Sequence, residues 1–223
     1  MDNHSKKVLI IGGRGKVARL ATEMLVEANA SVTSLVRTVE SVAEVEVLGA
    51  SALVRDLTEI SLDEWTEILA DYDAVVWAAG NGGRGGADVT YAVDRDGAIE
   101  VIDALATLEF PPRFIMVSYI GSLETTATDD GGTWYAYVEA KKAADQHLLA
   151  TEIEYIILAP SALTDDPARG IALVENTPAG ADGVKTSREL VAEMVAEMVL
   201  RATLPEEDFI AFVDGDEEIL AVL

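Results

Sequence analysis

The sequence predicts a doubly wound parallel α/β sheet in three layers, formed by a single domain. Short apolar segments alternate with longer segments in which apolar residues recur at helical spacing. The apolar segments are too uniformly hydrophobic to have a solvated face, which is typical of parallel strands covered on both sides. A chain of 223 residues with 50% hydrophobic residues is long enough to build one large core.

The first unit of this pattern is a strand, a glycine turn and a helix. Residues 8–11 are an apolar run of buried-strand type, and the turn Gly12-Gly13-Arg14-Gly15 follows them. Apolar residues then recur at helical spacing over 16–26. This order favours anion binding, because glycines let the main chain approach a phosphate and the first helical N–H groups point at it.

The spacing of this turn departs slightly from the usual dinucleotide pattern. It reads Gly12-x-x-Gly15-x-x-Ala18, where the common form is Gly-x-Gly-x-x-Gly. Ala18 suits the third position, since close packing of helix on strand needs only a small side chain there. An ordinary strand–helix turn is the alternative, but the clean strand before it and the clean helix after it favour a dinucleotide site.

The later elements follow with breakers between them. Further strands are predicted, each on a short apolar run, at 31–36, 52–54, 73–79, 114–118, 155–159 and 209–213. Helices are predicted, mainly from their apolar spacing, at 43–48, 62–69, 89–108, 135–150 and 188–201. Ser187-Arg188-Glu189 is predicted to form a capping box at the start of the last helix. The stretch 161–186 contains three glycines and two prolines and is expected to be irregular.

Ligands of such sheets bind beyond the carboxyl ends of the strands, where the strand order reverses. The residues directly after the predicted strands are therefore the candidate site residues. They are Gly12 to Gly15, Arg37, Asp56, Gly80, Ser118 and Pro160.

The end of the second strand indicates which dinucleotide binds. An NAD site places a carboxylate there for the ribose hydroxyl, roughly 20 residues past the glycines, but this chain has Arg37. A guanidinium favours a 2′-phosphate, and Arg14 could close on the same group. Glu40 is a competing NAD-type residue, yet it lies beyond the strand end, so we favour NADP over NAD.

The composition limits the other functions that the chain could have. Forty acidic and sixteen basic residues give a net charge of −24, which disfavours nucleic acid and anionic membranes as partners. The excess of acid fits either simple solubility or a salt-rich cytoplasm. No apolar run reaches the roughly 18 residues of a membrane span, and without cysteine or a histidine cluster we expect no metal site and a cytoplasmic protein.

One motif carries candidate chemistry. Tyr137 and Lys141 lie four residues apart in a predicted helix, hence on one face. A nearby ammonium is expected to lower the pKa of the phenol, so that Tyr137 could act as acid or base in carbonyl reduction or alcohol oxidation. A solvated helix face is the alternative, and Tyr135 is a rival tyrosine without a lysine at the same offset.

Taken together, these motifs resemble the short-chain dehydrogenase/reductase superfamily, and in particular its atypical, single-domain NAD(P)H-binding group with sugar-epimerase-like ancestry. The resemblance covers nearly the whole chain and implies a Rossmann-type sheet. Besides the glycine turn and Tyr137-x-x-x-Lys141, the matching segments are Leu35-Val36-Arg37, Arg55-Asp56-Leu57-Thr58, Ala78-Ala79-Gly80, Gly85-Gly86-Ala87-Asp88, Val93-Asp94-Arg95-Asp96-Gly97-Ala98, 113–118, 155–160, Leu163-Thr164-Asp165-Asp166-Pro167 and 187–191.

The resemblance implies roles for these residues. Gly12, Gly13, Arg14, Gly15, Lys16 and Val17 would wrap the pyrophosphate, and Arg37 would bind the 2′-phosphate. Asp56 and Leu57 would border the adenine, while Ala78, Ala79 and Gly80 would lie at the adenosine ribose. Ser118, Tyr137 and Lys141 would form the reactive centre, with Lys141 also on the cofactor ribose. Pro160 would flank the nicotinamide, and 161–186 would form a small substrate-pocket region.

Two departures from the family pattern leave the activity open. Tyr119 stands where relatives often carry a second serine, and Ala159 replaces the arginine usual before the terminal proline of the sixth strand. An NADPH-dependent oxidoreductase acting on a small carbonyl or related acceptor is the favoured function. An NADP(H)-binding redox sensor without turnover is second, and a sugar-nucleotide epimerase or dehydratase is third, since little chain remains after Pro160 for a substrate domain. The expected partner is a small-molecule substrate bound near 80–90 and 161–186, in a monomer or homodimer.

Overall fold

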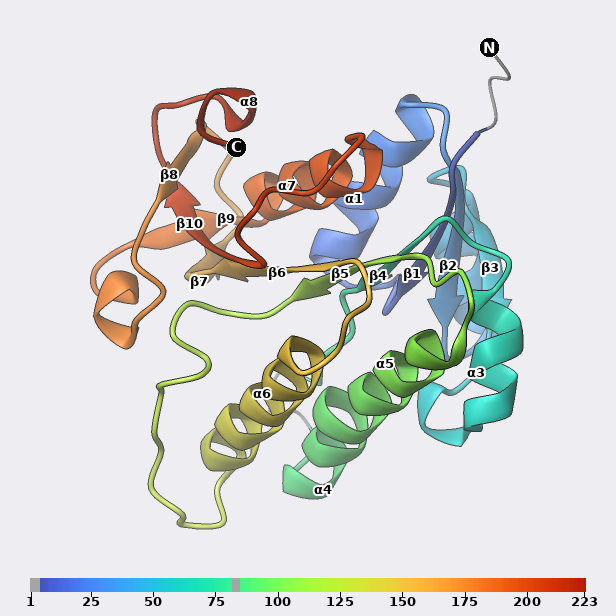
Figure 1. The fold of residues 1–223 in the computed structure, drawn as a ribbon, viewed down its shortest axis with the longest axis horizontal. Helices are drawn as coiled ribbons and strands as arrows, with labels where there is room; N and C mark the ends of the chain where they lie inside the picture. Colours follow the sequence, from blue (N-terminus) through green and yellow to red (C-terminus); the bar gives the residue numbers. More distant parts are fainter. Residues whose placement is uncertain (1–4, 82–84) are drawn as a thin grey trace.

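The computed structural model describes residues 5–81 and 85–223 and contains one eight-stranded sheet with helices on both faces (Figure 1). The strand order is β3-β2-β1-β4-β5-β6-β10-β8, and all neighbours pair in parallel except β10 with β8. The strands are β1 (Lys7–Ile11), β2 (Ser31–Val36), β3 (Ser51–Val54), β4 (Ala74–Trp77), β5 (Arg113–Val117), β6 (Tyr155–Pro160), β8 (Ile171–Leu173) and β10 (Phe209–Asp214). The order reverses between β1 and β4, which confirms the predicted doubly wound sheet.

The connections between these strands are mainly helical. The helices are α1 (Lys16–Glu27), α2 (Val42–Glu46), α3 (Leu62–Leu69), α4 (Ala87–Thr90), α5 (Ala98–Thr107), α6 (Thr133–Leu149), α7 (Arg188–Leu200) and α8 (Ile219–Val222). Short 3₁₀ turns are η1 (Val39–Ser41), η2 (Leu57–Glu59) and η4 (Pro178–Ala181), and η3 (Tyr91–Gly97) is a π-helical turn. A second, two-stranded sheet pairs β7 (Ala162–Thr164) with β9 (Lys185–Ser187).

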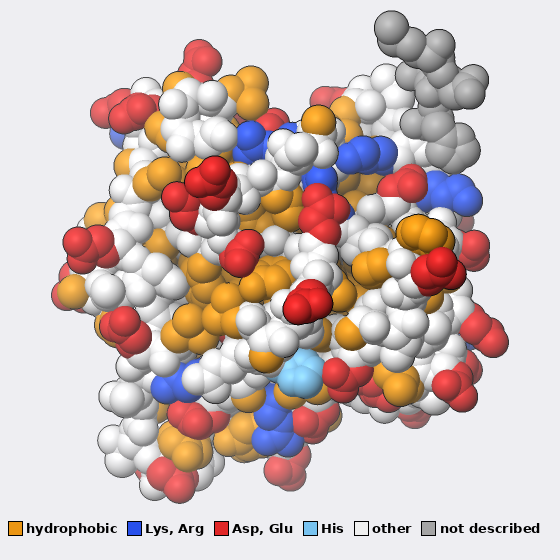
Figure 2. All heavy atoms as spheres, viewed as in Figure 1, with side chains coloured by type: hydrophobic (Ala, Val, Ile, Leu, Met, Phe, Trp, Pro, Cys, Tyr) orange, Lys and Arg blue, Asp and Glu red, His pale blue; other side chains and the backbone are white. Residues whose placement is uncertain are grey.

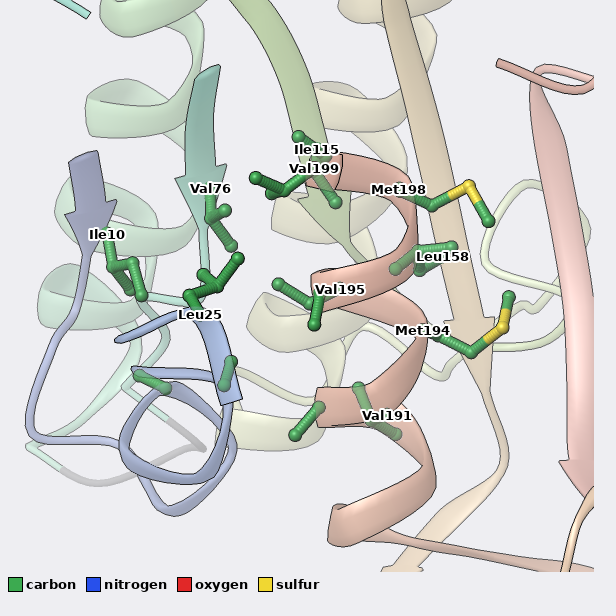
Figure 3. Packing of buried hydrophobic residues seen from close by; sticks show 14 of the residues in the cluster. Ile10, Leu25, Val76, Ile115, Leu158, Val191, Met194, Val195, Met198 and Val199 are labelled. Carbon is green, nitrogen blue, oxygen red and sulfur yellow. The ribbon is translucent and has the colours of Figure 1, made fainter. Parts of the chain in front are cut away.

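Alternate side chains of each central strand face the two helical layers on opposite sides of the sheet. In β1, Val8 and Ile10 pack with α1 and α7, whereas Leu9 and Ile11 face the core under α3, α5 and α6. All four side chains are fully buried, as expected of a strand covered on both faces. Figure 3 shows how Val191, Met194, Val195, Met198 and Val199 of α7 pack against the central strands. The apolar character of each central strand is thus explained by the three-layer arrangement.

The segment 161–186 is more ordered than its composition predicts, and the expectation of an irregular stretch is wrong in part. It contributes β7, β8 and part of β9, and β8 runs antiparallel to β10 at the edge of the large sheet. Each of these strands has only three residues, and their partners lie far away in the sequence. A strand of three residues is too short to show an alternation of apolar and polar side chains in the sequence. These strands form because they pair with distant segments of the chain.

The long helix predicted over 89–108 is interrupted. A π-helical turn, η3, joins α4 to α5 and contains Asp94, whose side chain is buried. Gly97 lies at the end of this turn, where a Cβ would stand 2.6 Å from the Leu57 side chain. Turns of this kind are frequent at functional sites, and Asp94 lines the cleft described below.

The predicted capping box at Ser187 is wrong in its second half. The Ser187 hydroxyl accepts from the backbone N–H of Leu190, as a helix cap should. The Glu189 carboxylate instead accepts from the N–H of Ala168 at 2.7 Å, and the Ser187 N–H donates to Asp214. Ala168 and Asp214, which are distant in the sequence, therefore take the hydrogen bonds that Glu189 and Ser187 would make to each other in a capping box.

Carboxylates are spread over much of the face seen in Figure 2, with fewer basic side chains between them. Within the described part of the chain, no helix has both the length and the apolar character needed to cross a bilayer.

Candidate functional site

The glycine turn brings the end of β1 against the segment that follows β4. Gly12 has φ +89°, and a Cβ at this position would stand 2.6 Å from the Ala79 Cα. The Gly15 N–H donates to the Gly12 carbonyl at 2.9 Å, which closes the turn tightly. A side chain at Gly12 would thus require both strained backbone and a shift of the neighbouring strand end.

The start of α1 has the features of an anion site. Its N-cap is Gly15, no side chain caps its first N–H groups, and its first turn contains no acidic residue. This is notable in a chain with forty carboxylates. Uncapped N–H groups at a helix start carry partial positive charge and need a partner, which a phosphate would supply.

A cleft of about 350 Å³ opens at this edge of the sheet. Most of the expected pyrophosphate, ribose and reactive-centre residues line it together. Its lining comprises Gly15, Lys16, Val17, Ala78, Ala79, Gly80, Asp94, Val117, Ser118, Tyr137, Lys141, Leu163 and Arg188. The structure therefore joins the turn after β1, the end of β4, the end of β5 and one face of α6 in a single hollow.

Other predicted site residues lie outside the lining of this cleft. Arg37 follows β2 as an exposed residue, and Pro160 is buried at the end of β6. Asp56 accepts from the Thr58 N–H and hydroxyl and caps η2, next to Leu57. These four positions remain predictions that depend on a bound dinucleotide extending beyond the cleft, and so do Gly12, Gly13 and Arg14, which also lie outside its lining. Within the region 80–90, which is expected to lie near the substrate, residues 82–84 lie outside the described part of the chain.

Arg14, in the glycine turn, already has a carboxylate partner. Its Nη2 lies 3.5 Å from Glu44 Oε1, and Arg19 contacts the other oxygen of Glu44 at 3.4 Å. These side chains are roughly half exposed, so the pairs are weak and exchangeable. The Arg14 side chain therefore stays accessible to solvent, although it contacts Glu44.

Tyr137 is the central ring of an aromatic stack. Its ring lies 5.6 Å from that of Tyr119 and 5.8 Å from that of Trp134, measured between centroids. Burial raises its pKa well above the ordinary tyrosine value, and the nearby Asp94, Tyr119 and Asp145 raise it further. The expected lowering of the Tyr137 pKa by Lys141 is thus wrong for this structure, because burial and the neighbouring aspartates raise that pKa instead.

The ammonium of Lys141 is buried and points to the end of β5. Its Nζ donates to the Val117 carbonyl oxygen at 2.8 Å. Its charge lowers the pKa of both Asp94 and Asp145, although burial has the larger effect and leaves both pKa values raised. Lys141 therefore lies close enough to two buried aspartates to favour their charged forms, a role that the tyrosine–lysine spacing did not indicate.

Asp145 was missed by the sequence interpretation. It lies wholly buried on α6 and accepts from the hydroxyls of both Ser118 and Ser122, the latter at 2.6 Å. Asp145 follows Lys141 by four residues, so the helical spacing places Tyr137, Lys141 and Asp145 on one face. That spacing was the available signal.

The sequence motifs contain Asp94 and Arg188 but assign neither of them a role in the site. Asp94 accepts from the Asn81 N–H at 2.8 Å, and its pKa is raised by burial. Arg188, the first residue of α7, reaches Asp165 at 2.8 Å, and Asp165 also contacts Lys16 at 2.6 Å. Only the fold brings these residues to the cleft.

The reversed strand order, the uncapped helix start and the cleft at the strand ends define a protein of the Rossmann-like, nucleotide-binding α/β class. A family model described as NAD(P)H-binding matches residues 12–202, and the chain belongs to this family. The residues present fit a dinucleotide, because the first N–H groups of α1 are uncapped and Gly15, Lys16 and Val17 line the cleft at the strand ends.

Relatives and solved structures are similar to this chain over nearly its whole length. The UPF0659 protein YMR090W of Saccharomyces cerevisiae is 30% identical over 95% of this chain and 94% of its own. A Bacillus halodurans structure, named for NAD-dependent epimerases/dehydratases, is 30% identical, with a TM-score of 0.82 and 98% of each chain covered. A Veillonella parvula short-chain dehydrogenase/reductase, solved in complex with NADP, shares the fold at 17% identity, with a TM-score of 0.67 and 97% of this chain and 100% of its own covered.

Proposed function

We propose that this protein is an NADP(H)-dependent oxidoreductase of the short-chain dehydrogenase/reductase type that acts on a small carbonyl or related acceptor. The observation that carries this proposal is the shared cleft: Tyr137 and Lys141 line the same hollow as the uncapped start of α1. A dinucleotide bound there would supply hydride to an acceptor carbon. The protein would supply binding, orientation and a proton.

The proposed cofactor site follows the elements in order. Residues 12–17 hold the pyrophosphate, and Ala78, Ala79 and Gly80 border the adenosine ribose. Asp56 and Leu57 border the adenine, and Pro160 flanks the nicotinamide. Residues 161–186 shape the substrate pocket, a role supported by Leu163 of β7, which lines the cleft.

Tyr137 is proposed as the proton donor. Its raised pKa keeps the phenol protonated at neutral pH, so a proton is available at the Oη atom. An oxygen that gains negative charge during reduction is more basic than a phenolate, and transfer to it is favourable even from a weak acid. The rings of Tyr119 and Trp134 fix the plane of Tyr137.

Lys141 and Ser118 are proposed to act beside it. One N–H of Lys141 is used on Val117, which leaves two donors for a ribose hydroxyl or for Tyr137. The hydroxyl of Ser118 donates to Asp145, so its oxygen is free to accept but its proton is committed. Ser118 would thus orient a donor group of the substrate or of Tyr137.

The preference for NADP over NAD rests on Arg37 and Arg14. Both side chains are exposed near the ends of β1 and β2, where an adenosine 2′-phosphate would need cations. In a chain of net charge −24, cations at these positions are the attractive groups for a phosphate. The Veillonella structure with bound NADP is a precedent from the same fold.

A cofactor-binding redox sensor without turnover is the second candidate. The bond from Ser118 to Asp145 favours it, because the serine proton is not available to polarise a carbonyl. Tyr119 at the position of a second serine points the same way. A sensor would bind the cofactor in the same cleft but would not oxidise it.

The deciding experiment has two stages. Calorimetry with NADPH and NADH first tests cofactor binding, and uptake of neither would exclude enzyme and sensor together. Cofactor oxidation is then followed with aldehydes, ketones, quinones and flavins, and a sugar nucleotide is included to detect epimerisation. Turnover supports the oxidoreductase, whereas tight, redox-dependent binding without turnover supports the sensor.

A further inference from the structure

We propose that Asp165 is a resident anion that competes with the cofactor phosphates for Lys16 and Arg188, and that Arg188 is a further phosphate-binding residue. This inference rests on the proposed cofactor site. It adds a residue from the C-terminal part of the chain to a site otherwise built by the first strands. It also predicts that one carboxylate weakens cofactor binding.

The geometry places one carboxylate between two cations. Asp165 Oδ2 lies 2.6 Å from Lys16 Nζ, and Asp165 Oδ1 lies 2.8 Å from Arg188 Nη1. Lys16 is the first residue of α1, and Arg188 is the first residue of α7. The two cations come from helices far apart in sequence, and the Asp165 carboxylate forms an ion pair with each of them.

Both cations also face the proposed cofactor cleft. Lys16 and Arg188 line the 350 Å³ cleft and, on their other side, a second cavity of about 550 Å³ that Asp165 lines. Among residues 5–81 and 85–223, the two cavities share only this pair in their linings. Lys16 and Arg188 therefore form the wall between the cleft and the place where Asp165 lies.

The contact is of a kind that a phosphate can displace. The side chains of Lys16 and Asp165 are 66% and 62% exposed, and exposed ion pairs contribute little to stability. Lys16 above all, and then Arg188, hold the pKa of Asp165 below its usual range, so the carboxylate is charged at neutral pH. A diphosphate offers more charge and more acceptor oxygens to the same two cations.

Charge repulsion makes the two anions alternatives. With Asp165 in place, a phosphate on the first N–H groups of α1 would have a carboxylate close by that is already bonded to the side chain of Lys16. Like charges at short range disfavour each other. Removing the charge of Asp165 should therefore strengthen cofactor binding, although the substitution breaks two ion pairs.

The test compares matched substitutions by calorimetric titration with NADPH at low salt. Asp165→Asn should tighten binding roughly two- to fivefold, in line with the strength of exposed pairs. Asp166→Asn makes the same charge change one residue away, where the carboxylate forms no ion pair among the described residues, and should leave affinity nearly unchanged. Arg188→Gln should weaken binding about tenfold, as loss of a charged hydrogen bond does.

A double variant isolates the competition. In the Arg188→Gln background, Asp165→Asn should have a smaller effect, since one of the two contested cations is gone. High salt should also shrink the effect of Asp165→Asn. Thermal melts of each variant establish that it is folded, and Arg188→Met, which removes the charge but keeps a long unbranched side chain, replaces Arg188→Gln if that variant does not fold.

The outcomes separate this inference from the proposed function. If the wild type binds NADPH but Asp165→Asn binds no more tightly than Asp166→Asn, the competition is disproved and the cofactor site stands. Unchanged affinity in the folded Arg188 variant would remove Arg188 from the site. If the wild type binds neither NADPH nor NADH, the cofactor proposal and this inference both fail.

Discussion

The hydroxyl of Ser118, at the end of β5, donates its hydrogen bond to the wholly buried carboxylate of Asp145 on α6. Asp145 also accepts from the hydroxyl of Ser122. The other carboxylate oxygen of Asp145, Oδ1, has no hydrogen-bond partner among the described residues. The carboxylate thus ties the proposed reactive centre to the interior of the protein. Burial raises its pKa, while Lys141 and the two serines oppose that rise.

Replacing Asp145 tests whether this network supports the fold. Asp145→Ala leaves two buried hydroxyls without their acceptor and removes a carboxylate close to the buried Lys141 ammonium, which should lower the free energy of unfolding by about 3 kcal/mol. Ser122→Ala is the control, because it removes one donor and leaves the charge balance intact, with an expected loss of about 1 kcal/mol. Urea titrations measure both values. Equal losses in the two variants would show that the carboxylate has no special role.

Tyr137→Phe tests the proposed proton donor. The change removes the hydroxyl and keeps the ring in its stack with Tyr119 and Trp134, so folding and NADPH affinity should change little. Turnover should fall by roughly 10²- to 10⁴-fold, the usual contribution of general acid catalysis. Tyr135→Phe is the matched control on the same helix and should keep full activity. Full turnover in Tyr137→Phe would remove this mechanism.

The pH dependence of reduction follows from the direction of the Tyr137 shift. Because burial raises the pKa of Tyr137, its protonated form persists to higher pH than in a free tyrosine. Proton donation should therefore continue through neutral and mildly alkaline pH, with no loss assignable to Tyr137 below about pH 10. Rates measured from neutral to alkaline pH, compared with a stability profile over the same range, test this. A decline centred near neutrality, with the fold intact, would assign the proton to another group.

Gly12→Ala tests the close approach at the glycine turn. Gly12 has φ +89° and a Cβ there would lie 2.6 Å from backbone of Ala79, so the variant should lose several kcal/mol of stability or its cofactor affinity. Gly183→Ala separates the two effects, because Gly183 also has positive φ but no atom lies within 4 Å of a Cβ there. It should lose only about 1–2 kcal/mol. Equal behaviour of the two variants in thermal melts and NADPH titrations would contradict the steric argument.

Arg37→Gln tests the preference for NADP. If this guanidinium binds the 2′-phosphate, its loss should weaken NADPH binding about tenfold and leave NADH binding unchanged. Arg169→Gln makes the same charge change at an exposed residue that lines neither cavity of the proposed site. Equal weakening of both cofactors by Arg37→Gln would indicate a general charge effect.

The sequence was sufficient for features that depend on neighbours in the chain. The glycine turn, the strand before it and the helix after it have local signatures, and β2 and α3 occupy the predicted residues. The parallel sheet could be inferred because each central strand is apolar on both faces. The carboxyl-end rule then placed the turn, the end of β4 and Ser118 in one cleft.

Features that depend on distant contacts could not be predicted. The antiparallel β8 exists through its pairing with β10, and Glu189 finds its partner in Ala168 rather than in Ser187. The pKa of Tyr137 depends on burial and on Asp94 and Asp145, whose positions follow from a π turn and from helix packing. The local spacing of a phenol and an ammonium therefore predicted the wrong direction for the pKa shift of Tyr137.

The aromatic stack has a practical consequence for spectroscopy. Of the three tryptophans, Trp65 and Trp77 are fully buried, whereas Trp134 is 58% exposed and stacks on Tyr137. The emission of Trp134 should therefore lie at longer wavelength than that of the two buried tryptophans, and Trp134 neighbours a residue that lines the cleft. The protein thus carries its own fluorescent probe in contact with Tyr137 of the proposed site, and quenching of that emission would report occupancy without any added label.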